Sequence, residues 1–318
     1  MTATGVLAVM KDVWSDAVIA RARAGDMATL LRLDALGVLI APGEDAEDFA
    51  GRLTRLRDAE RGLREALKRD GTAEPVKGIV IRPDAEIPRS IRLAAWRVTE
   101  RLYGVRPEWV AGFFVNERFG FLWGGCSLSE PGSGLNLFII RRVFRKKQRW
   151  LCYDRTELLA HELCHAARQA LDDWRFEEYF AYRTARSGLR RRFGSCFVHP
   201  LDAWGFLLPV MLLPVMQFLQ VLGVWPGVMW PFWILAGVFP VFLLYRNGRT
   251  RSLARRAERR LREMGIAAPG AVLFRLTAPE IAELARAASG AAAAEFLLQV
   301  WKKDLRGAVL QARFAAGQ

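Results

Sequence analysis

The hydrophobic and polar positions of this 318-residue chain are distributed unevenly. From Ala203 to Tyr245, 43 consecutive residues include no Asp, Glu, Lys, Arg or His. A bilayer core is about 30 Å thick and a helix needs roughly 20 residues to cross it. The segment therefore predicts two membrane-spanning helices with a tight turn near Trp225-Pro226-Gly227. The alternative is a hairpin buried in a soluble core, but burying so long an apolar segment would require much more surrounding protein.

Clusters of arginine flank this segment on both sides. They are Arg183, Arg186 and residues 190–192 before it, and eight arginines between Arg246 and Arg262 after it. Because basic residues are retained on the cytoplasmic side of a membrane, we expect both chain ends in the cytoplasm. The chain is therefore predicted to be an integral membrane protein with two spans, in a bacterial inner membrane.

The remaining pattern predicts an α+β protein. Residues 10–70 have the three- and four-residue spacing of amphipathic helices, and the pattern is helical again after Trp150. Between these regions lie strand-like runs at 78–82, 109–115, 119–123 and 135–143. We therefore expect an N-terminal helical region (1–75), an α+β domain (76–200), the transmembrane hairpin (201–245) and a basic helical C-terminal region (246–318).

The chain is strongly basic. The chain has 47 Lys and Arg against 33 Asp and Glu, a net charge of +14, which implies an anionic partner. No nucleic-acid-binding motif accompanies the arginines, so we expect anionic lipid at the basic flanks and no specific nucleic acid. The 11 Trp and 19 Phe exclude intrinsic disorder. Four Cys without a CxxC pair exclude a disulfide scaffold and indicate a reducing compartment.

The segment most indicative of chemistry is an HExxH motif formed by His161, Glu162 and His165 in a predicted helix. Histidines four residues apart lie above one another on one helix face, so both imidazoles can reach one Zn²⁺ ion. Glu162 is rotated by about 100° around the helix, where it misses the metal but can act on a water molecule as general base. Such a motif also occurs by chance on solvated helices, but here it contains two of only three histidines.

This pattern resembles the zincin metallopeptidases over roughly residues 76–190. The third histidine, His199, lies at the start of the hairpin, which excludes the extended motif with a third histidine directly downstream. The resemblance is therefore to the gluzincin branch, whose third ligand is a Glu of a second helix, followed three residues later by Ala or Ser. Glu178 with Ala181 matches that pattern, and Glu177 is the alternative ligand.

The resemblance further implies a zincin-like catalytic domain: a small mixed sheet, an active-site helix and a glutamate helix. In the family, an edge strand of the sheet binds the extended peptide, and residues 135–143 are the candidate here. Tyr182, one turn beyond Glu178, would donate to the oxyanion or orient a ligand, or else would be a packed core aromatic. Cys164 faces away from the ligands, and we expect it to be a small packing residue.

We therefore predict a membrane-anchored zinc metallopeptidase that hydrolyses peptide bonds. His161, His165 and Glu178 would hold Zn²⁺, Glu162 would be the general base toward a zinc-activated water, and Tyr182 would be a further catalytic residue. The partners would be a peptide or protein substrate and the lipid bilayer. The alternatives are a non-catalytic zincin-like membrane adaptor that binds a protein partner, and a peptidase dedicated to one regulatory protein.

Overall fold

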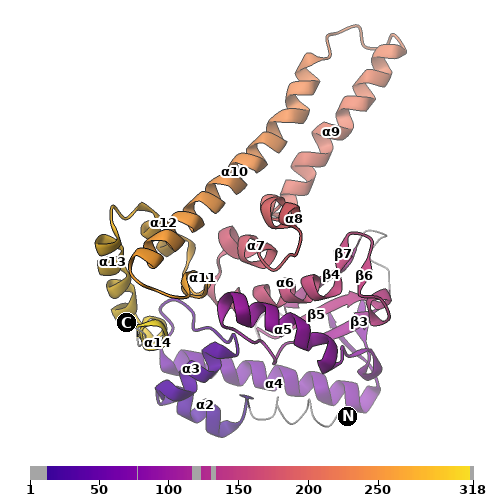
Figure 1. Ribbon diagram of the computed structural model, residues 1–318. Coiled ribbons are helices and arrows are strands. Elements are labelled where there is room, and N and C mark those ends of the chain that lie inside the picture. The colour runs from indigo at the N-terminus through magenta and orange to yellow at the C-terminus, as the bar shows by residue number, and fades with distance from the viewer. Residues whose placement is uncertain (1–12, 77, 117–122, 130–133, 316–318) are drawn as a thin grey trace.

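A computed structural model describes residues 13–76, 78–116, 123–129 and 134–315 of the chain. The architecture is mixed α+β, as the sequence predicts, with the small sheets at one side of a mostly helical body (Figure 1). The α-helices are α2 (Asp16–Arg23), α3 (Met27–Ala35), α4 (Ala46–Asp70), α5 (Arg89–Tyr103), α6 (Arg155–Arg168), α7 (Trp174–Tyr182), α8 (Gly188–Phe193), α9 (Pro200–Val221), α10 (Trp230–Glu263), α11 (Pro269–Leu273), α12 (Ala278–Arg286), α13 (Gly290–Lys303) and α14 (Leu305–Phe314). The strands are β1 (Ala73–Val76), β2 (Ile79–Ile81), β3 (Ala111–Val115), β4 (Gly125–Ser129), β5 (Asn136–Arg141), β6 (Arg149–Trp150) and β7 (Tyr153–Asp154).

A three-stranded sheet with the order β3-β5-β4 lies beside α6. Strands β3 and β5 are parallel, with Ala111 opposite Leu137, and β4 is antiparallel to β5, with Gly125 opposite Ile140. All six residues of β5 are buried, as is typical of a strand that is covered on both faces. The prediction that residues 135–143 form the edge strand is therefore wrong. Among the described residues β4 pairs only with β5, so β4 is the edge strand next to α6.

The other strand predictions have mixed outcomes. The runs at 78–82 and 109–115 are confirmed by β2 and β3. The run at 119–123 lies almost entirely outside the described residues. Helix α5 was not predicted, and the usual start signal is missing from it, because Pro88 occupies the N-cap position and no side chain caps the helix.

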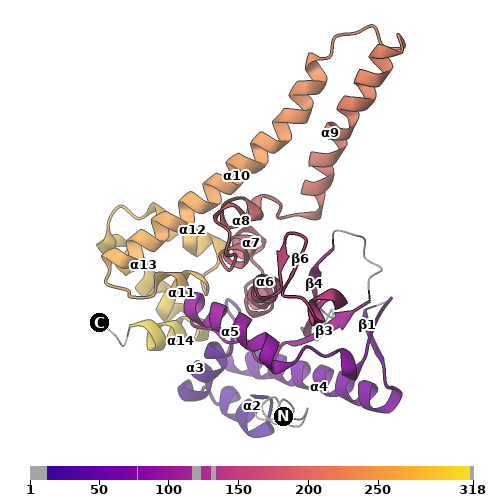
Figure 2. The same ribbon diagram turned by 45° about the vertical axis from the view of Figure 1, so that its right-hand side comes forward.

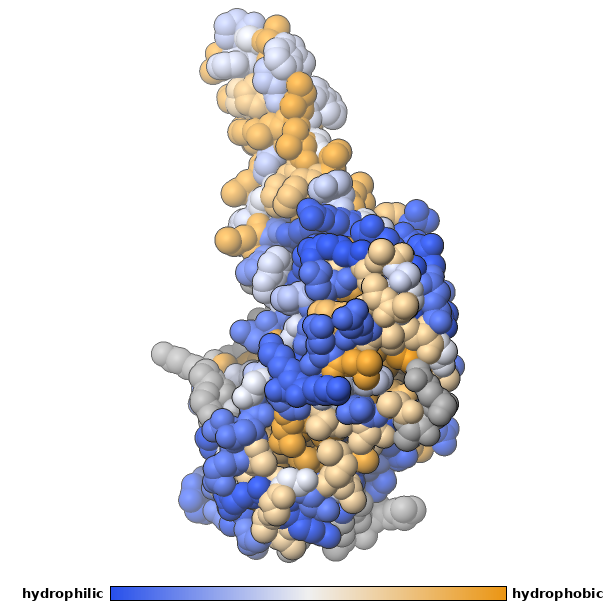
Figure 3. Space-filling view, turned by 90° about the vertical axis from the view of Figure 1, so that its left-hand side faces the viewer, coloured by the Kyte–Doolittle hydropathy of each residue, from blue (hydrophilic) through white to orange (hydrophobic). Residues whose placement is uncertain are grey.

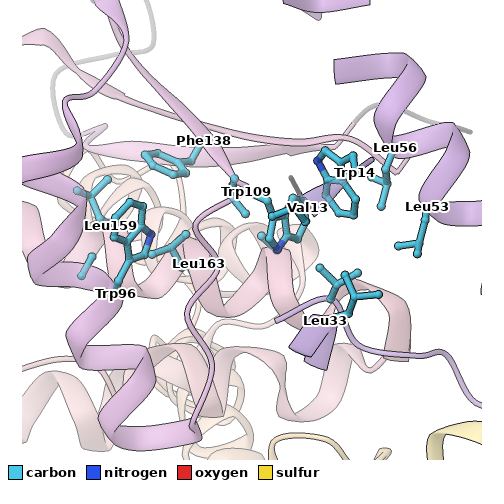
Figure 4. Packing of buried hydrophobic residues seen from close by; sticks show 14 of the residues in the cluster. Val13, Trp14, Leu33, Leu53, Leu56, Trp96, Trp109, Phe138, Leu159 and Leu163 are labelled. Carbon is cyan, nitrogen blue, oxygen red and sulfur yellow. The ribbon is translucent and has the colours of Figure 1, made fainter. Parts of the chain in front are cut away.

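One hydrophobic core joins the N-terminal helices to the sheet and to α6. Figure 4 shows Trp96 of α5, Phe138 of β5 and Leu159 of α6 packed at one end of this core. At the other end, Trp109 donates a hydrogen bond from its indole N–H to the backbone carbonyl of Leu36, at 3.0 Å. The N-terminal helices therefore support one side of α6.

A second core joins α6 and α7 to the helices that follow the hairpin. Cys164, Phe180 and Phe274 are buried in it, and the ring of Tyr103 stacks on Phe274 with centroids 4.2 Å apart. Helix α6 thus lies between two cores, one built largely from elements before it in the chain and one largely from elements after it. Its backbone is fixed from both sides.

Helices α9 and α10 extend side by side away from the rest of the molecule (Figures 1 and 2). The chain reverses between Val221 and Trp230, where the sequence predicts the turn. Leu201–Val221 is the one helix among the described residues that is long and apolar enough to cross a membrane, and 6% of its apolar window is buried. The uncharged part of α10 is shorter, because Arg246 follows Tyr245. Of the two predicted spans, one therefore meets the length and composition that a bilayer requires.

Candidate metal centre

Helix α6 presents the HExxH motif on its least buried face. Asp154 caps the helix by accepting hydrogen bonds from the backbone N–H groups of Thr156 at 2.9 Å and Glu157 at 3.2 Å. His161 and His165 are half-buried, whereas their neighbours in the helix are buried. The Nε2 atoms of the two histidines are 3.1 Å apart. The spacing of four residues therefore brings both imidazoles to one point.

A tight reversal after α6 returns the chain toward these histidines. Arg168, the last residue of α6, is buried and donates to the carboxylate of Asp173 at 2.6 Å. The same carboxylate caps α7 by accepting from two backbone N–H groups of its first turn. Between them, Asp172 adopts a left-handed conformation with φ of 46°. This buried ion pair fixes where α7 begins and hence which of its side chains face α6.

Glu178 of α7 completes a group of three potential metal ligands. Its Oε2 lies 3.5 Å from Nε2 of His161, and its Oε1 lies 3.5 Å from Nε2 of His165. The ligand atoms of all three residues lie within 4.8 Å of one another. Donors placed about 2.0–2.2 Å from a tetrahedral zinc ion are themselves about 3.3–3.5 Å apart. Two imidazoles and a carboxylate in this arrangement thus fit zinc in donor chemistry and in spacing.

Glu177, the alternative ligand, occupies a different position. Its Oε1 lies 3.6 Å from Nδ1 of His165, the nitrogen that faces away from the other two ligands. In metal sites, a carboxylate at this nitrogen orients the imidazole and increases its basicity. The backbone of Ala181 likewise interacts with the ring of His161 and favours its protonated form. The two adjacent glutamates therefore reach His165 at different nitrogens.

Burial and neighbouring charges give the two histidines different protonation. Burial, together with His165, lowers the pKa of His161 well below its ordinary value, so this ring is neutral near pH 7, the form that binds a metal. Burial also acts to lower the pKa of His165, but the neighbouring carboxylates of Glu177 and Glu178 raise it to about 9. Carboxylates thus favour a positive charge at this point, which a divalent cation can supply as well as a proton.

Glu162 is buried next to the three ligands without being one of them. Burial, aided by the charge of Glu178, raises its pKa to about 7. The backbone of Ser127 in the edge strand β4 interacts with this carboxylate and partly offsets the rise in its pKa. A carboxylate with a pKa near neutrality can both take up and release a proton, as general acid–base catalysis requires.

Tyr182 lies against the same group of residues. Its ring packs edge to face on His161, with centroids 4.6 Å apart. Burial and the charge of Glu178 raise the pKa of Tyr182 to about 12, so its hydroxyl keeps a proton to donate. A Cβ atom at Gly194 would lie 2.1 Å from the tyrosine ring, so the glycine makes room for it. The tyrosine is half-buried beside the ligands rather than enclosed in a core.

Two further residues have structural roles. Cys164 is buried in the second core, and burial raises the pKa of its thiol, which agrees with the predicted packing role. His199 caps the N-terminus of α9 and contacts the ring of Trp174 at a centroid distance of 5.5 Å. It is not in the group of potential ligands.

The roles of three further residues at this site were not predicted from the sequence. Ser127 and Ala181 act through their backbone, and Gly194 through its lack of a side chain. None of these roles depends on a chemically distinctive side chain. A local sequence pattern therefore could not have identified them.

Comparison with models of protein families, with curated proteins and with solved structures found no match to this chain. The chemistry of the site is therefore the basis for assigning a function. The site combines three ligands suited to a divalent metal, a buried carboxylate with a pKa near 7, and a protonated tyrosine, all close to the edge of a sheet.

Proposed function

We propose that this protein is a membrane-anchored zinc metallopeptidase of the gluzincin-like type. The observation that carries the proposal is the convergence of His161, His165 and Glu178, with Glu162 buried next to them. Two imidazoles and one carboxylate are the donor set of catalytic zinc sites, which keep a fourth position open. A structural site would close this position with a fourth protein ligand, and no other His, Cys, Asp or Glu of the described residues joins the group.

The protein's own residues would handle the protons of the reaction. Zinc held by such a donor set supplies Lewis acidity toward a carbonyl and lowers the pKa of water to about 7. Glu162, with a pKa of about 7, takes the proton of the attacking water and delivers it to the leaving amine. Glu177 orients His165, and the hydroxyl of Tyr182 donates a hydrogen bond to the oxygen that gains charge.

The edge strand supports an extended peptide as substrate. Among the described residues, no strand pairs with the side of β4 opposite β5, so its backbone is available to an added strand. The backbone of Ser127 in this strand interacts with the carboxylate of Glu162, the proposed general base. We therefore expect the substrate to be an unfolded or extended segment of a peptide or protein.

We further propose that α9 and the first part of α10 cross the membrane as a two-span hairpin. Large apolar side chains face outward along both helices, among them Leu208 (61% exposed), Phe218 (62%) and Val238 (59%). Figure 3 shows this apolar surface changing to a hydrophilic one where the hairpin meets the body. An exposed apolar surface of this kind marks an interaction site, and the arginines at both flanks favour a cytoplasmic location for both termini and the metal site.

The zinc dependence of peptide cleavage tests this proposal. Full-length protein in detergent micelles is expected to cleave an unstructured peptide, to lose this activity when a chelator removes the metal, and to regain it with added zinc. A variant at the exposed surface of α12, Glu283→Gln, serves as a control and should behave like the wild type. Protein that binds no zinc and cleaves no peptide would exclude the peptidase and favour the non-catalytic adaptor.

A further inference from the structure

A cavity of about 300 Å³ lies where the hairpin joins the rest of the molecule. It is enclosed by the start of α7, the chain segment that leads into α9, and the middle of α10. Three arginines line it, Arg175 from α7 and Arg246 and Arg249 from α10, whereas no Asp or Glu does. The cavity is separate from the metal ligands, although α7 contributes to both.

The positive charge of this cavity is only partly compensated within the protein. Arg246 forms an ion pair with Asp202 at the start of α9. Arg175 contacts the ring of Phe176, and neither Arg175 nor Arg249 forms an ion pair with any described residue. Two arginines without an ion-pair partner among the described residues therefore line a cavity that no carboxylate lines, an arrangement that favours an anion.

Around the cavity, apolar, aromatic and basic side chains follow one another in the order that is typical of a membrane interface. Phe242 and Tyr245 are 47% and 65% exposed and end the uncharged part of α10, and Arg246 and Arg249 follow directly on the same helix. Trp174, 55% exposed, stands opposite on α7. Aromatic side chains between an apolar segment and basic residues are typical of the level at which lipid headgroups begin.

We propose that this cavity binds the phosphate group of an anionic phospholipid. The phosphate would contact Arg175 and Arg249, the glycerol region would lie against Trp174 and Tyr245, and the acyl chains would follow Phe242 along the hairpin. A free phosphate ion would use the same arginines but would gain nothing from the exposed aromatic rim. The proposal rests on the membrane location of the hairpin and not on peptidase activity.

A lipid bound here would contact the helix that carries the third metal ligand. Trp174 and Arg175 form the first turn of α7, and Glu178 follows one turn later. The headgroup would thus connect the membrane surface to Glu178 through a single short helix.

Lipid binding by full-length protein in detergent, measured by native mass spectrometry, tests the proposal. The wild type should bind phosphatidylglycerol at least tenfold more tightly than phosphatidylcholine. Because each arginine near the surface contributes about 1 kcal/mol toward an anionic lipid, the loss of two in Arg175→Gln/Arg249→Gln should reduce the affinity for phosphatidylglycerol by about 30-fold. The matched control, Arg256→Gln/Arg259→Gln, removes two exposed arginines of α10 that lie outside the cavity and should keep the preference.

Each other outcome has a definite meaning. Equal losses in both double variants would show attraction by a diffuse basic surface and would overturn the cavity site. Inorganic phosphate that binds as tightly as the lipid would overturn the lipid assignment in favour of a soluble anion. The lipid-binding measurement uses no peptide substrate. Protein that fails to cleave peptides can therefore still show the predicted preference for phosphatidylglycerol. Protein that stays soluble without detergent would instead contradict the membrane hairpin itself.

Discussion

Helices α6 and α9 differ in which side chains they bury. Helix α6 buries ionisable residues, including Glu157, Glu162 and Arg168. Helix α9 has Asp202 as its one charged residue, and most of its large apolar side chains are exposed. A single exposed leucine is ordinary, but buried charges and a large exposed apolar surface both require a partner.

The partners of the two helices lie in different places. In α6 they are within the protein: Glu157 accepts from Arg190 at 2.9 Å, Arg168 pairs with Asp173, and Glu162 interacts with the backbone of Ser127 in β4. The apolar face of α9 contacts α10 on one side and otherwise has no cover among the described residues. The fold therefore accounts for the buried charges of α6. It leaves the apolar face of α9 uncovered, and we propose that the bilayer covers it.

The largest expected effect concerns the buried carboxylate of α6. Glu162→Gln keeps the size and the three ligands but removes the base, so peptide hydrolysis should fall by about 10²–10⁴-fold or more. Zinc content should be unchanged, because Glu162 is not a ligand. Initial rates on a fluorogenic peptide and metal analysis of the same sample measure both. Wild-type cleavage by Glu162→Gln would show that this residue is not the base.

The next prediction distinguishes the roles of the two neighbouring glutamates of α7 in zinc binding. Glu178→Ala removes a ligand and should weaken zinc binding by more than about 100-fold, whereas Glu177→Ala removes the orienting partner of His165 and should weaken it by about 10–100-fold. Competition with a zinc chelator of known affinity measures both values. The reverse order would assign the third ligand to Glu177.

The surroundings of α9 can be tested by adding one charge. Leu208 in α9 and Leu298 in α13 are both exposed, by 61% and 42%. If α9 lies in a bilayer, Leu208→Arg should disfavour insertion by about 2.5–3.5 kcal/mol. Leu298→Arg, in water, should change stability by less than about 0.5 kcal/mol. Resistance to alkaline extraction of membranes and thermal melting report the two effects, and two equally harmless substitutions would mean that α9 is surrounded by water.

The smallest effect concerns Tyr182. Tyr182→Phe removes one hydroxyl beside the ligands while leaving the ring packed on His161, so kcat should fall by about tenfold with little change in KM or zinc content. Steady-state kinetics with metal analysis separates these quantities. A change in zinc binding alone would assign Tyr182 to the positioning of His161.

The sequence predicted the features of the site that a single helix determines. The shared position of His161 and His165 follows from helical geometry. Glu178 was predicted as the third ligand because its spacing from Ala181 resembles the gluzincin pattern. The role of Glu177 at Nδ1 of His165 could not be predicted, because it depends on how α7 rotates after the buried pair of Arg168 and Asp173. That rotation is set by tertiary packing.

The fold was predictable at the level of its elements but less so in their arrangement. The pattern correctly indicated helices, strands and an α+β class, yet it assigned the edge strand to residues 135–143 instead of β4. The order of strands is a non-local property, although the continuous apolar run of β5 is itself typical of a central strand. Periodicity likewise shows which face of a helix is buried but not against which element, so the enclosure of α6 by two cores was not foreseen.

X-ray absorption at the zinc edge of the purified full-length protein can show whether His161, His165 and Glu178 hold a zinc ion. We expect one zinc per chain, bound by nitrogen and oxygen at about 2.0–2.2 Å with no sulfur ligand. Protein without zinc, or a sulfur ligand at about 2.3 Å such as Cys164 within the motif, would contradict this expectation.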